Sequence, residues 1–484
     1  MRILFVYPNV TRQRAPQLGI AMISAIAKEL GHQIDIFDLT IIPEGKEILS
    51  FKAILSNFKP DILAISSRSN EWTFVKKLCR SANIGNMIKI FGGPHPTVSP
   101  EDAIAIADIV VIGEGEEIFS EILKKLEKKE DLTQIPGCWV KKDGKIFKNP
   151  MRKLISNLDT LPLPNWKFFN NIHYYNNYHI SEIRGAKVIG TFEGSRGCPY
   201  NCSYCTNAYM QSLYKNGGSW RREKSPERLI EEIKLFRAQY GLDGVFFIDD
   251  IVLTKKEKLR RFRDLYRSKI KVPIIFLERP ENMTDEKVHI IKEANAFYVS
   301  IGIESGDENL RRNLLNRHHS QETIIAAFKT AQKYGLKTTA FTMIGFPGQD
   351  YRSIHKTYYI LKKAKPDLVQ TTIFYPLKRT KLYDMMVQEG LFDPNTEMPI
   401  GYYGTNDIEL IKYQFLLQYY YLPRFFLNLF LFVRNRNLSN RLFNYFLEIV
   451  RKYRIGGISL IVDFFSRILK RKITKLIFRK NLNF

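Results

Sequence analysis

The sequence predicts an α/β protein with two regions of alternating strands and helices and a basic helical tail. Short apolar segments alternate with helical segments over residues 1–130 and again over residues 187–405. Such alternation is typical of parallel sheets with helices on their faces. Residues 131–186 carry turn signals, among them Pro136-Gly137, and are interpreted as a connector. Residues 406–484 are rich in Phe, Tyr, Leu, Lys and Arg and are interpreted as the tail.

The first region is predicted to form a Rossmann-like parallel sheet. Its expected strands are residues 3–7, 33–37, 62–66, 88–91 and 109–112, and an apolar-periodic helix spans residues 18–30. Ligands of such sheets bind at the carboxyl ends of the strands. The loops at these ends contain Ser66, Ser67, Gly92, Gly93, His95 and the run Gly113-Glu114-Gly115-Glu116. No G-x-G-x-x-G follows the first strand, so the pattern does not favour a dinucleotide.

The second region is predicted to contain six strand–helix units, the first of which begins near Lys187. The other strands are expected at residues 245–248, 274–277, 298–303, 338–344 and 369–374. Helices are expected at residues 226–239, 254–268, 285–294, 307–315 and 321–334, with Asp285 and Asp307 as N-caps. Six such units form a partial (β/α)6 barrel, and barrels place their active sites at the carboxyl ends of the strands.

Three of the five cysteines lie close together, as Cys198, Cys202 and Cys205 in a C-x3-C-x2-C motif. An iron–sulfur cubane normally takes four Cys ligands, so three from one loop leave one iron open. Zinc is the main alternative, but a closed zinc site needs a fourth ligand, and no second C-x2-C or H-x3-H motif appears. A disulfide framework is disfavoured, because five cysteines are few and odd in number for a chain of 484 residues.

The motif, with Tyr204 before its last cysteine, resembles the signature of radical S-adenosylmethionine (SAM) enzymes. The preceding run Thr191-Phe192-Glu193-Gly194-Ser195-Arg196-Gly197 fits a strand that leads into the cluster loop. The resemblance implies a [4Fe–4S] cluster on the three cysteines, whose open iron chelates SAM. One electron, from a flavodoxin- or ferredoxin-type donor, then cleaves SAM to methionine and a 5′-deoxyadenosyl radical.

The same resemblance implies SAM-binding residues at the strand ends of the second region. Asp249 and Asp250 correspond to the element that meets the SAM amino group, although this pair also fits an ordinary helix cap. Glu304 and Ser305 resemble the element that binds the ribose and methionine. Further candidates are Gly345 and Gly348 beside the adenine and Arg317 for the SAM carboxylate. Arg317 also fits a solvated arginine at a helix end.

The first region resembles the cobalamin-binding domain that precedes many radical SAM cores. The similarity rests on Gln17-Leu18-Gly19, on Gly31-His32 and on the loops at residues 66–67, 92–95 and 113–116. The D-x-H-x-x-G element that supplies an axial histidine in other cobalamin domains is absent. His95 is the only candidate ligand in a suitable loop, and its alternative is a loop histidine bonded to nearby backbone. The domain could also be empty of cobalamin.

Together the resemblances imply a cobalamin-dependent radical SAM enzyme that methylates an unactivated carbon of a small or lipid-like substrate. A ring-forming oxidative cyclase of the magnesium-protoporphyrin ester type has the same architecture and remains an alternative. A non-catalytic, membrane-associated binding protein with a vestigial core is a third reading. The loop after the last strand carries Lys378, Arg379 and Lys381 in place of the family's Pro-Gly pair, which suggests an anionic substrate.

Charge separates the tail from the rest of the chain. The net charge is +25, and from residue 411 onward fifteen Lys and Arg accompany only Glu448 and Asp463. Basic amphipathic helices can bind an anionic membrane surface, can cover the barrel with a solvated face or, less plausibly, can bind nucleic acid. The N-terminal apolar run before Pro8 is too short for a signal peptide. No segment reaches the roughly 20 apolar residues of a spanning helix. We therefore expect a cytoplasmic protein, with peripheral contact at the inner membrane face as one reading of the tail.

Overall fold

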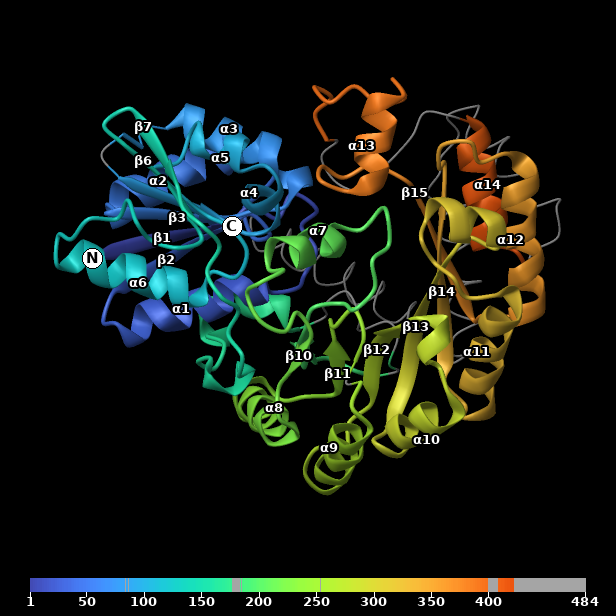
Figure 1. The fold of residues 1–484 in the computed structure, drawn as a ribbon. Coiled ribbons are helices and arrows are strands. Elements are labelled where there is room, and N and C mark those ends of the chain that lie inside the picture. The colour runs from blue at the N-terminus through green and yellow to red at the C-terminus, as the bar shows by residue number, and fades with distance from the viewer. Residues whose placement is uncertain are drawn as a thin grey trace, which may run out of the picture.

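The computed structural model describes residues 1–421, with the exception of residues 83, 86, 176–182, 184, 253 and 399–407. Two large sheets of seven and six strands form its centre, and helices cover them (Figure 1). The first sheet, in blue and cyan, and the second sheet, in green to orange, lie side by side with helix α7 (Thr206–Leu213) between them. The predicted α/β architecture is confirmed.

The first sheet has the strand order β2-β1-β3-β4-β5-β6-β7. Five parallel strands begin the sheet, namely β1 (Arg2–Tyr7), β2 (Gln33–Asp38), β3 (Ile62–Ser66), β4 (Ile88–Gly92) and β5 (Ile109–Val111). These strands lie within one residue of the predicted ends. The order 2-1-3-4-5 puts a switch point between β1 and β3, where doubly wound sheets bind ligands.

The strands of this sheet are apolar runs in the sequence because both faces of the sheet are buried, as strand β1 illustrates. Phe5 faces helix α6, where its ring centroid lies 5.9 Å from that of Phe119. Leu4 and Val6 face the opposite way, into a second apolar core that contains Phe51. The helices of this region are α1 (Leu18–Glu29), α2 (Glu47–Phe58), α3 (Trp72–Ser81), α4 (Pro94–Val98), α5 (Pro100–Ile104) and α6 (Glu116–Glu127).

The connector is joined to the first sheet. Strands β6 (Cys138–Lys142) and β7 (Lys145–Lys148) form an antiparallel hairpin, and β6 pairs with β5. Further along the connector, His173 is fully buried, and its Nε2 lies 2.5 Å from Oδ2 of Asp38. The structure thus anchors much of residues 131–186 on the first region.

The second sheet is entirely parallel and has the order β15-β14-β13-β12-β11-β8. Its strands are β8 (Ile189–Phe192), β11 (Gly244–Phe247), β12 (Ile274–Glu278), β13 (Ala296–Glu304), β14 (Lys337–Ile344) and β15 (Leu368–Ile373). Helices α8 (Pro226–Tyr240), α9 (Lys256–Lys269), α10 (Asp285–Glu293), α11 (Gln321–Lys333) and α12 (Tyr351–Ala364) connect them. The sequence marks these ends well: Ser225 caps α8 by accepting a hydrogen bond from the Arg228 amide, and Pro226 follows.

One of the two predicted N-caps is wrong and the other is confirmed. Thr284 caps α10, since its hydroxyl accepts from the Lys287 amide, and Asp285 is already the first helical residue. Asp307 caps the next helical segment, since its Oδ1 accepts from the Asn309 amide at 3.1 Å, and it also pairs with Lys356 at 3.0 Å. The predicted helix at residues 307–315 is shorter, with residues 308–309 α-helical and a π-helical turn at Leu310–Leu314.

The start of the predicted tail is part of the barrel. Helix α14 (Ile408–Gln418) lies beside β15, the last strand of the second sheet (Figure 1). Gln414 donates from Nε2 to the carbonyl oxygen of Thr371 at 2.8 Å, and Leu417 is fully buried. The predicted basic helices beyond residue 421 lie outside the described residues. Among the described residues, no helix is both long and apolar enough to cross a membrane.

Candidate functional site

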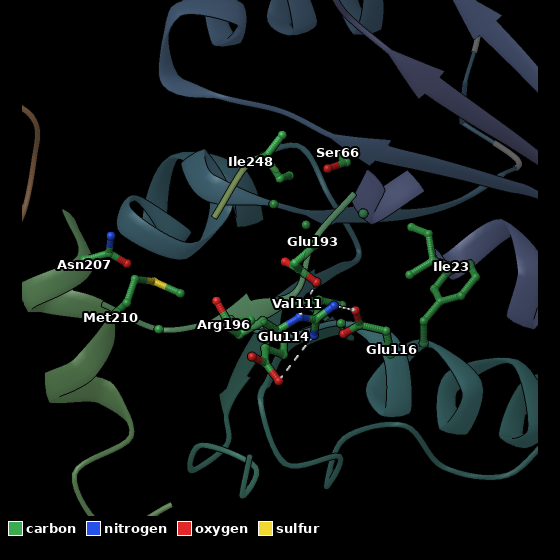
Figure 2. A pocket seen from close by; sticks show the side chains of 18 of the residues that line it. Ile23, Ser66, Val111, Glu114, Glu116, Glu193, Arg196, Asn207, Met210 and Ile248 are labelled. Carbon is green, nitrogen blue, oxygen red and sulfur yellow. Dashed lines mark hydrogen bonds and ion pairs between the residues drawn. The ribbon is translucent and has the colours of Figure 1, made fainter. Parts of the chain in front are cut away.

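A cavity of about 360 Å³ lies between the two sheets and is lined from both sides (Figure 2). The first region contributes strand-end loops with Ser66, Gly92, Gly93 and the run from Gly113 to Glu116. The second region contributes Gly197 of the cysteine loop, Asn207 and Met210 of α7, and Asp249 and Asp250 after β11. The structure therefore brings most of the predicted cobalamin residues and part of the predicted SAM site to one cavity.

The cysteine loop runs from β9 (Ser195–Arg196) to α7 and is fixed by backbone contacts. Gly197 has φ +83°, and a Cβ atom there would lie 2.2 Å from the Trp220 carbonyl oxygen. The Trp220 indole donates to the Cys198 carbonyl at 3.0 Å. Within the loop, the Cys205 amide donates to the Cys202 carbonyl at 3.1 Å. These contacts hold the three cysteines on one short, closely supported segment.

The thiols sit in a protected environment. Burial raises the pKa of Cys198 to about 11 and that of Cys205 to about 12, so a metal must displace their protons to bind the thiolates. Cys202 is 6% exposed. Among the described residues, no three His, Cys, Asp or Glu side chains converge on a single metal ion. Cysteines that bind different irons of a cubane need not converge in this way, so three thiols on one loop fit a cluster.

The two aspartates after β11 have different partners. Asp249 is buried, accepts from the Gly194 amide at 2.9 Å and also accepts from the Ser195 hydroxyl. Burial raises its pKa to about 7. Asp250 accepts from Nδ2 of Asn207 at 2.7 Å. Asp249 thus orders the strand that leads to the cysteines, and Asp250 has the more accessible carboxylate.

Glu304 and Arg317 form an ion pair beside the cysteine loop. Oε1 of Glu304 lies 3.1 Å from Nη1 of Arg317, and the Tyr204 hydroxyl donates to the same oxygen at 3.1 Å. The Arg317 side chain is 3% exposed, so its predicted alternative as a solvated arginine is wrong. Ser305 is fully buried, and its hydroxyl accepts from the Asp307 amide at 3.1 Å. In the structure, Arg317 is therefore engaged with Glu304, which competes with the predicted contact to a SAM carboxylate.

The loop after β14 also approaches Tyr204. The Gly345 amide donates to Oε1 of Gln349 at 2.8 Å, and Gly348 follows in the same turn. The ring of Phe346 stands 6.4 Å from that of Tyr204 and 4.8 Å from that of Phe374. This wall next to the cysteine loop is apolar and aromatic, as a surface for a purine ring would be.

On the cobalamin side, Ser66 accepts a hydrogen bond from Nε2 of Gln17 at 3.0 Å. Ser67 is fully buried, and its hydroxyl has no partner in the part of the chain that the structure describes. Oε1 of Gln17 is likewise without a hydrogen-bond partner there. Buried polar atoms of this kind normally have partners. The loop residues therefore fit a polar ligand at the β1–β3 switch point.

Glu114 and Glu116 take part in a charge network that crosses the domain interface. Figure 2 shows Arg196 between Glu114, Glu116 and Glu193. Nη2 of Arg196 lies 2.6 Å from Glu116, and Nη1 of Arg222, in β10 (Arg222–Glu223), lies 3.0 Å from Glu114. Burial would raise the pKa of Glu116, but Arg196, a backbone hydrogen bond and Arg222 together outweigh burial and lower it. These carboxylates line the cavity while they fasten the two domains together.

His95 does not line the interdomain cavity. Its ring stacks on Trp72 with centroids 4.4 Å apart, and its Nδ1 lies 3.2 Å from the Ser69 hydroxyl. Burial lowers its pKa to about 4. It lines a second cavity of about 500 Å³ together with Asp102 and Lys378. His95 is thus a packed histidine of the short helix α4 that bonds to the Ser69 side chain, which fits neither the predicted cobalamin contact nor the predicted bond to nearby backbone.

The basic loop after β15 contacts the first domain. Lys378 lies 3.0 Å from Asp102, and Arg379 lies 3.2 Å from Glu101. Both acids lie in the first turn of α5, whereas Lys381 is exposed at the start of α13 (Lys381–Gln388). Two of the three cations are thus paired within the protein, which weakens the inference of an anionic substrate.

We expect the substitution Arg379→Glu to destabilise the chain by up to about 1 kcal/mol, because it replaces a half-exposed attraction with a repulsion. The double variant Arg379→Glu/Glu101→Arg should recover most of that loss. Urea unfolding of both singles and the double gives the coupling energy. A coupling energy of zero would show that this loop does not hold the domains together.

Three functional residues were missed by the sequence reasoning. Arg196 and Arg222 lie on either side of the cysteine motif, and their role depends on acids 80 and 108 residues away in the sequence. Arg279, directly after β12, donates from Nη1 to Sγ of Cys202 at 3.1 Å. Its position at a strand end of the barrel was a signal that could have been used.

Comparison with known proteins agrees with this site. Residues 7–123 match the B12 binding domain, and residues 192–358 match the radical SAM superfamily. An uncharacterised methyltransferase of Pyrococcus horikoshii is 29% identical over 405 residues, which cover 81% of this chain and 84% of the relative. The cytidylyl-2-hydroxyethylphosphonate methyltransferase of Streptomyces wedmorensis is 23% identical, and the match covers 82% of this chain and 84% of that relative. The anaerobic magnesium-protoporphyrin IX monomethyl ester cyclase of Cereibacter sphaeroides is 22% identical, and the match covers 81% of this chain and 65% of that relative.

Among solved structures, the radical SAM methyltransferase TsrM of Kitasatospora setae superimposes with a TM-score of 0.63 at 14% identity. The match covers 82% of this chain and 78% of TsrM, whose structure holds cobalamin and a [4Fe–4S] cluster. Fold and site together define a radical SAM enzyme. The chain joins a B12-binding domain to a radical SAM domain, which is the architecture of its cobalamin-dependent radical SAM relatives. Its cofactors are a [4Fe–4S] cluster, SAM and cobalamin.

Proposed function

We propose that this enzyme methylates an unactivated carbon of a small or lipid-like substrate. The observation that carries the proposal is the shared cavity, in which loops of the B12-binding domain face the cysteine loop and the end of β11. A methyl carrier and a radical source must both reach one substrate carbon, and a single cavity between the domains supports that requirement. Both cofactors supply the difficult chemistry when bound: the cluster with SAM a deoxyadenosyl radical, cobalamin the methyl group.

The residues have separate tasks in this proposal. Cys198, Cys202 and Cys205 hold the cluster, and Asp250 and Glu304 hold the SAM amino group and ribose. Asp249 orders Gly194 and Ser195 ahead of the cysteine loop. On the opposite wall, the cobalamin contacts are Ser66, Gly92, Gly93, Gly113 and Gly115. The external electron donor and membrane contact through the tail remain predictions from the sequence.

The oxidative cyclase reaction is the second candidate, because cyclases are among the relatives of this chain. The two reactions differ in what they do with SAM. Methylation consumes one SAM as methyl donor, which leaves S-adenosylhomocysteine, and a second SAM as radical source, which leaves 5′-deoxyadenosine. Oxidative cyclisation removes electrons from its substrate, uses SAM only as the radical source and adds no carbon to its product.

The test is anaerobic reconstitution with iron, sulfide and hydroxocobalamin, followed by metal analysis and incubation with SAM and a strong reductant. We expect about four irons and about one cobalt per chain, and S-adenosylhomocysteine formation that requires cobalamin. Iron without cobalt, or deoxyadenosine without any S-adenosylhomocysteine, would refute the methyltransferase proposal. Once a substrate is known, the product mass should rise by one CH2 unit.

A further inference from the structure

Arg279 is a buried cation beside the cysteine loop that the proposed SAM site does not use. It follows strand β12 directly and is 7% exposed. Its Nη1 donates to Sγ of Cys202 at 3.1 Å. Charge-assisted hydrogen bonds of this kind are stronger than neutral ones. A central thiol of the motif is therefore permanently next to a positive charge.

The Tyr200 ring and the Cys202 sulfur hold the guanidinium in this position. The ring of Tyr200, which lies inside the motif, stacks with its centroid 3.6 Å from Cζ of Arg279. The Tyr200 hydroxyl donates to Asn282 at 3.1 Å, and the Arg279 amide donates to Glu278 at 3.0 Å. The cation is held between an aromatic face and a sulfur, with little rotamer freedom left.

A partly buried carboxylate, that of Glu281, balances this charge. Nη2 of Arg279 donates to Oε1 of Glu281 at 2.6 Å, and Nδ1 of His319 lies 3.2 Å from the same oxygen. Burial would raise the pKa of Glu281, but its contacts with His319 and Arg279 outweigh burial and hold it below the ordinary value. Glu281 is thus ionised. Side-chain contacts link Cys202 to Arg279, Arg279 to Glu281 and Glu281 to His319, in a row that leads away from the loop.

We propose that Arg279 and Glu281 set the reduction potential of the cluster through Cys202. The inference rests on the proposed cluster site. Reduction adds one negative charge to the cluster, and hydrogen bonds to its sulfurs and nearby charges determine how well that charge is tolerated. Arg279 stabilises the reduced state. Glu281 destabilises the reduced state, with a weaker effect because Arg279 lies between it and Cys202. Arg279 acts through the thiolate as a positioning residue and does not touch the substrate.

The experiment compares Arg279→Met and Glu281→Gln in the full-length, reconstituted protein. Midpoint potentials are measured by redox titration with electron paramagnetic resonance, without SAM or substrate. For Arg279→Met we expect the ratio of reduced to oxidised cluster at a fixed potential to fall about tenfold, which is a shift of about 59 mV to more negative values for one electron. Glu281→Gln should shift the potential the opposite way.

A matched pair of controls comes from another arginine–glutamate contact. Nη1 of Arg263 lies 2.8 Å from Glu293, on the outer helices α9 and α10. Arg263→Met and Glu293→Gln make the same chemical changes there and should leave the potential unchanged. This control shows whether any shift comes from the contact with Cys202 or from net charge alone.

The sign is the decisive readout, because a loosened cluster loop would move both variants in the same direction. Equal potentials in all proteins, or shifts of one sign in both Arg279→Met and Glu281→Gln, would overturn the inference. Should Arg279→Met fail to fold, Glu281→Gln alone still decides, since a potential at or below the unsubstituted value contradicts it. Failure of the unsubstituted protein to assemble a cluster would instead refute the proposed cluster site.

Discussion

The substitution Cys202→Ala is expected to abolish formation of 5′-deoxyadenosine from SAM. Only three cysteines lie in the motif, so the variant keeps two ligands, too few to hold a cubane with one open iron. The loss should be complete within detection, at least about 100-fold, because the reaction has no other electron source. The measurement is deoxyadenosine by mass spectrometry after anaerobic reduction, together with iron content.

Cys79→Ala provides the matched control for this result. Cys79 is also buried, at 7% exposed, but it lies under the first sheet in α3. This variant should cost about 1 kcal/mol of stability and keep its iron and its activity. Deoxyadenosine formation by Cys202→Ala, with iron retained, would remove Cys202 from the proposed ligands.

The second large effect is expected for Gly113→Ala, which should reduce cobalt content at least tenfold while iron content stays near that of the unsubstituted protein. Gly113 has φ +81°, and a Cβ atom there would lie 1.8 Å from the Tyr214 hydroxyl oxygen. Tyr214 would have to move, although it accepts a hydrogen bond from the Glu114 amide at 2.8 Å. The clash would therefore distort the loop that lines the cavity beside Ser66 and Gly93.

Gly144→Ala separates this clash from backbone strain. Gly144 has φ +75° in the turn between β6 and β7, and a Cβ atom there meets nothing within 4 Å. The control should lose about 1 kcal/mol of stability, as a left-handed alanine costs, and keep its cobalamin. Equal cobalt contents in Gly113→Ala and Gly144→Ala would exclude the 113–116 loop from the cobalamin site.

The fold was largely predictable because the strands are buried on both faces. Apolar runs such as those of β1 and β11 indicate where the strands begin and end, and parallel pairing then follows from the helices between them. Caps were less predictable. Thr284 and Asp285 are both good capping residues, and only the backbone geometry decides between them.

The candidate site was predictable where it is local in sequence and not where it depends on tertiary packing. The cysteines are recognised by spacing alone, whereas the partner of Arg196 is one of several acids in the 114–117 run. His95 illustrates the same limit. Its loop is at the correct edge of the sheet, but the ring stacks on Trp72 and lines a different cavity.

Helix α14 has a practical consequence for shortening this protein. Strand β15 is the border of an all-parallel sheet, and an uncovered border strand can recruit a strand from another molecule and lead to aggregation. Gln414 and Gln418 both reach the Thr371 carbonyl, so α14 shields that border. A truncation that removes the basic tail for crystallisation should therefore end after Tyr421. One that ends before Ile408 would leave β15 open to self-association.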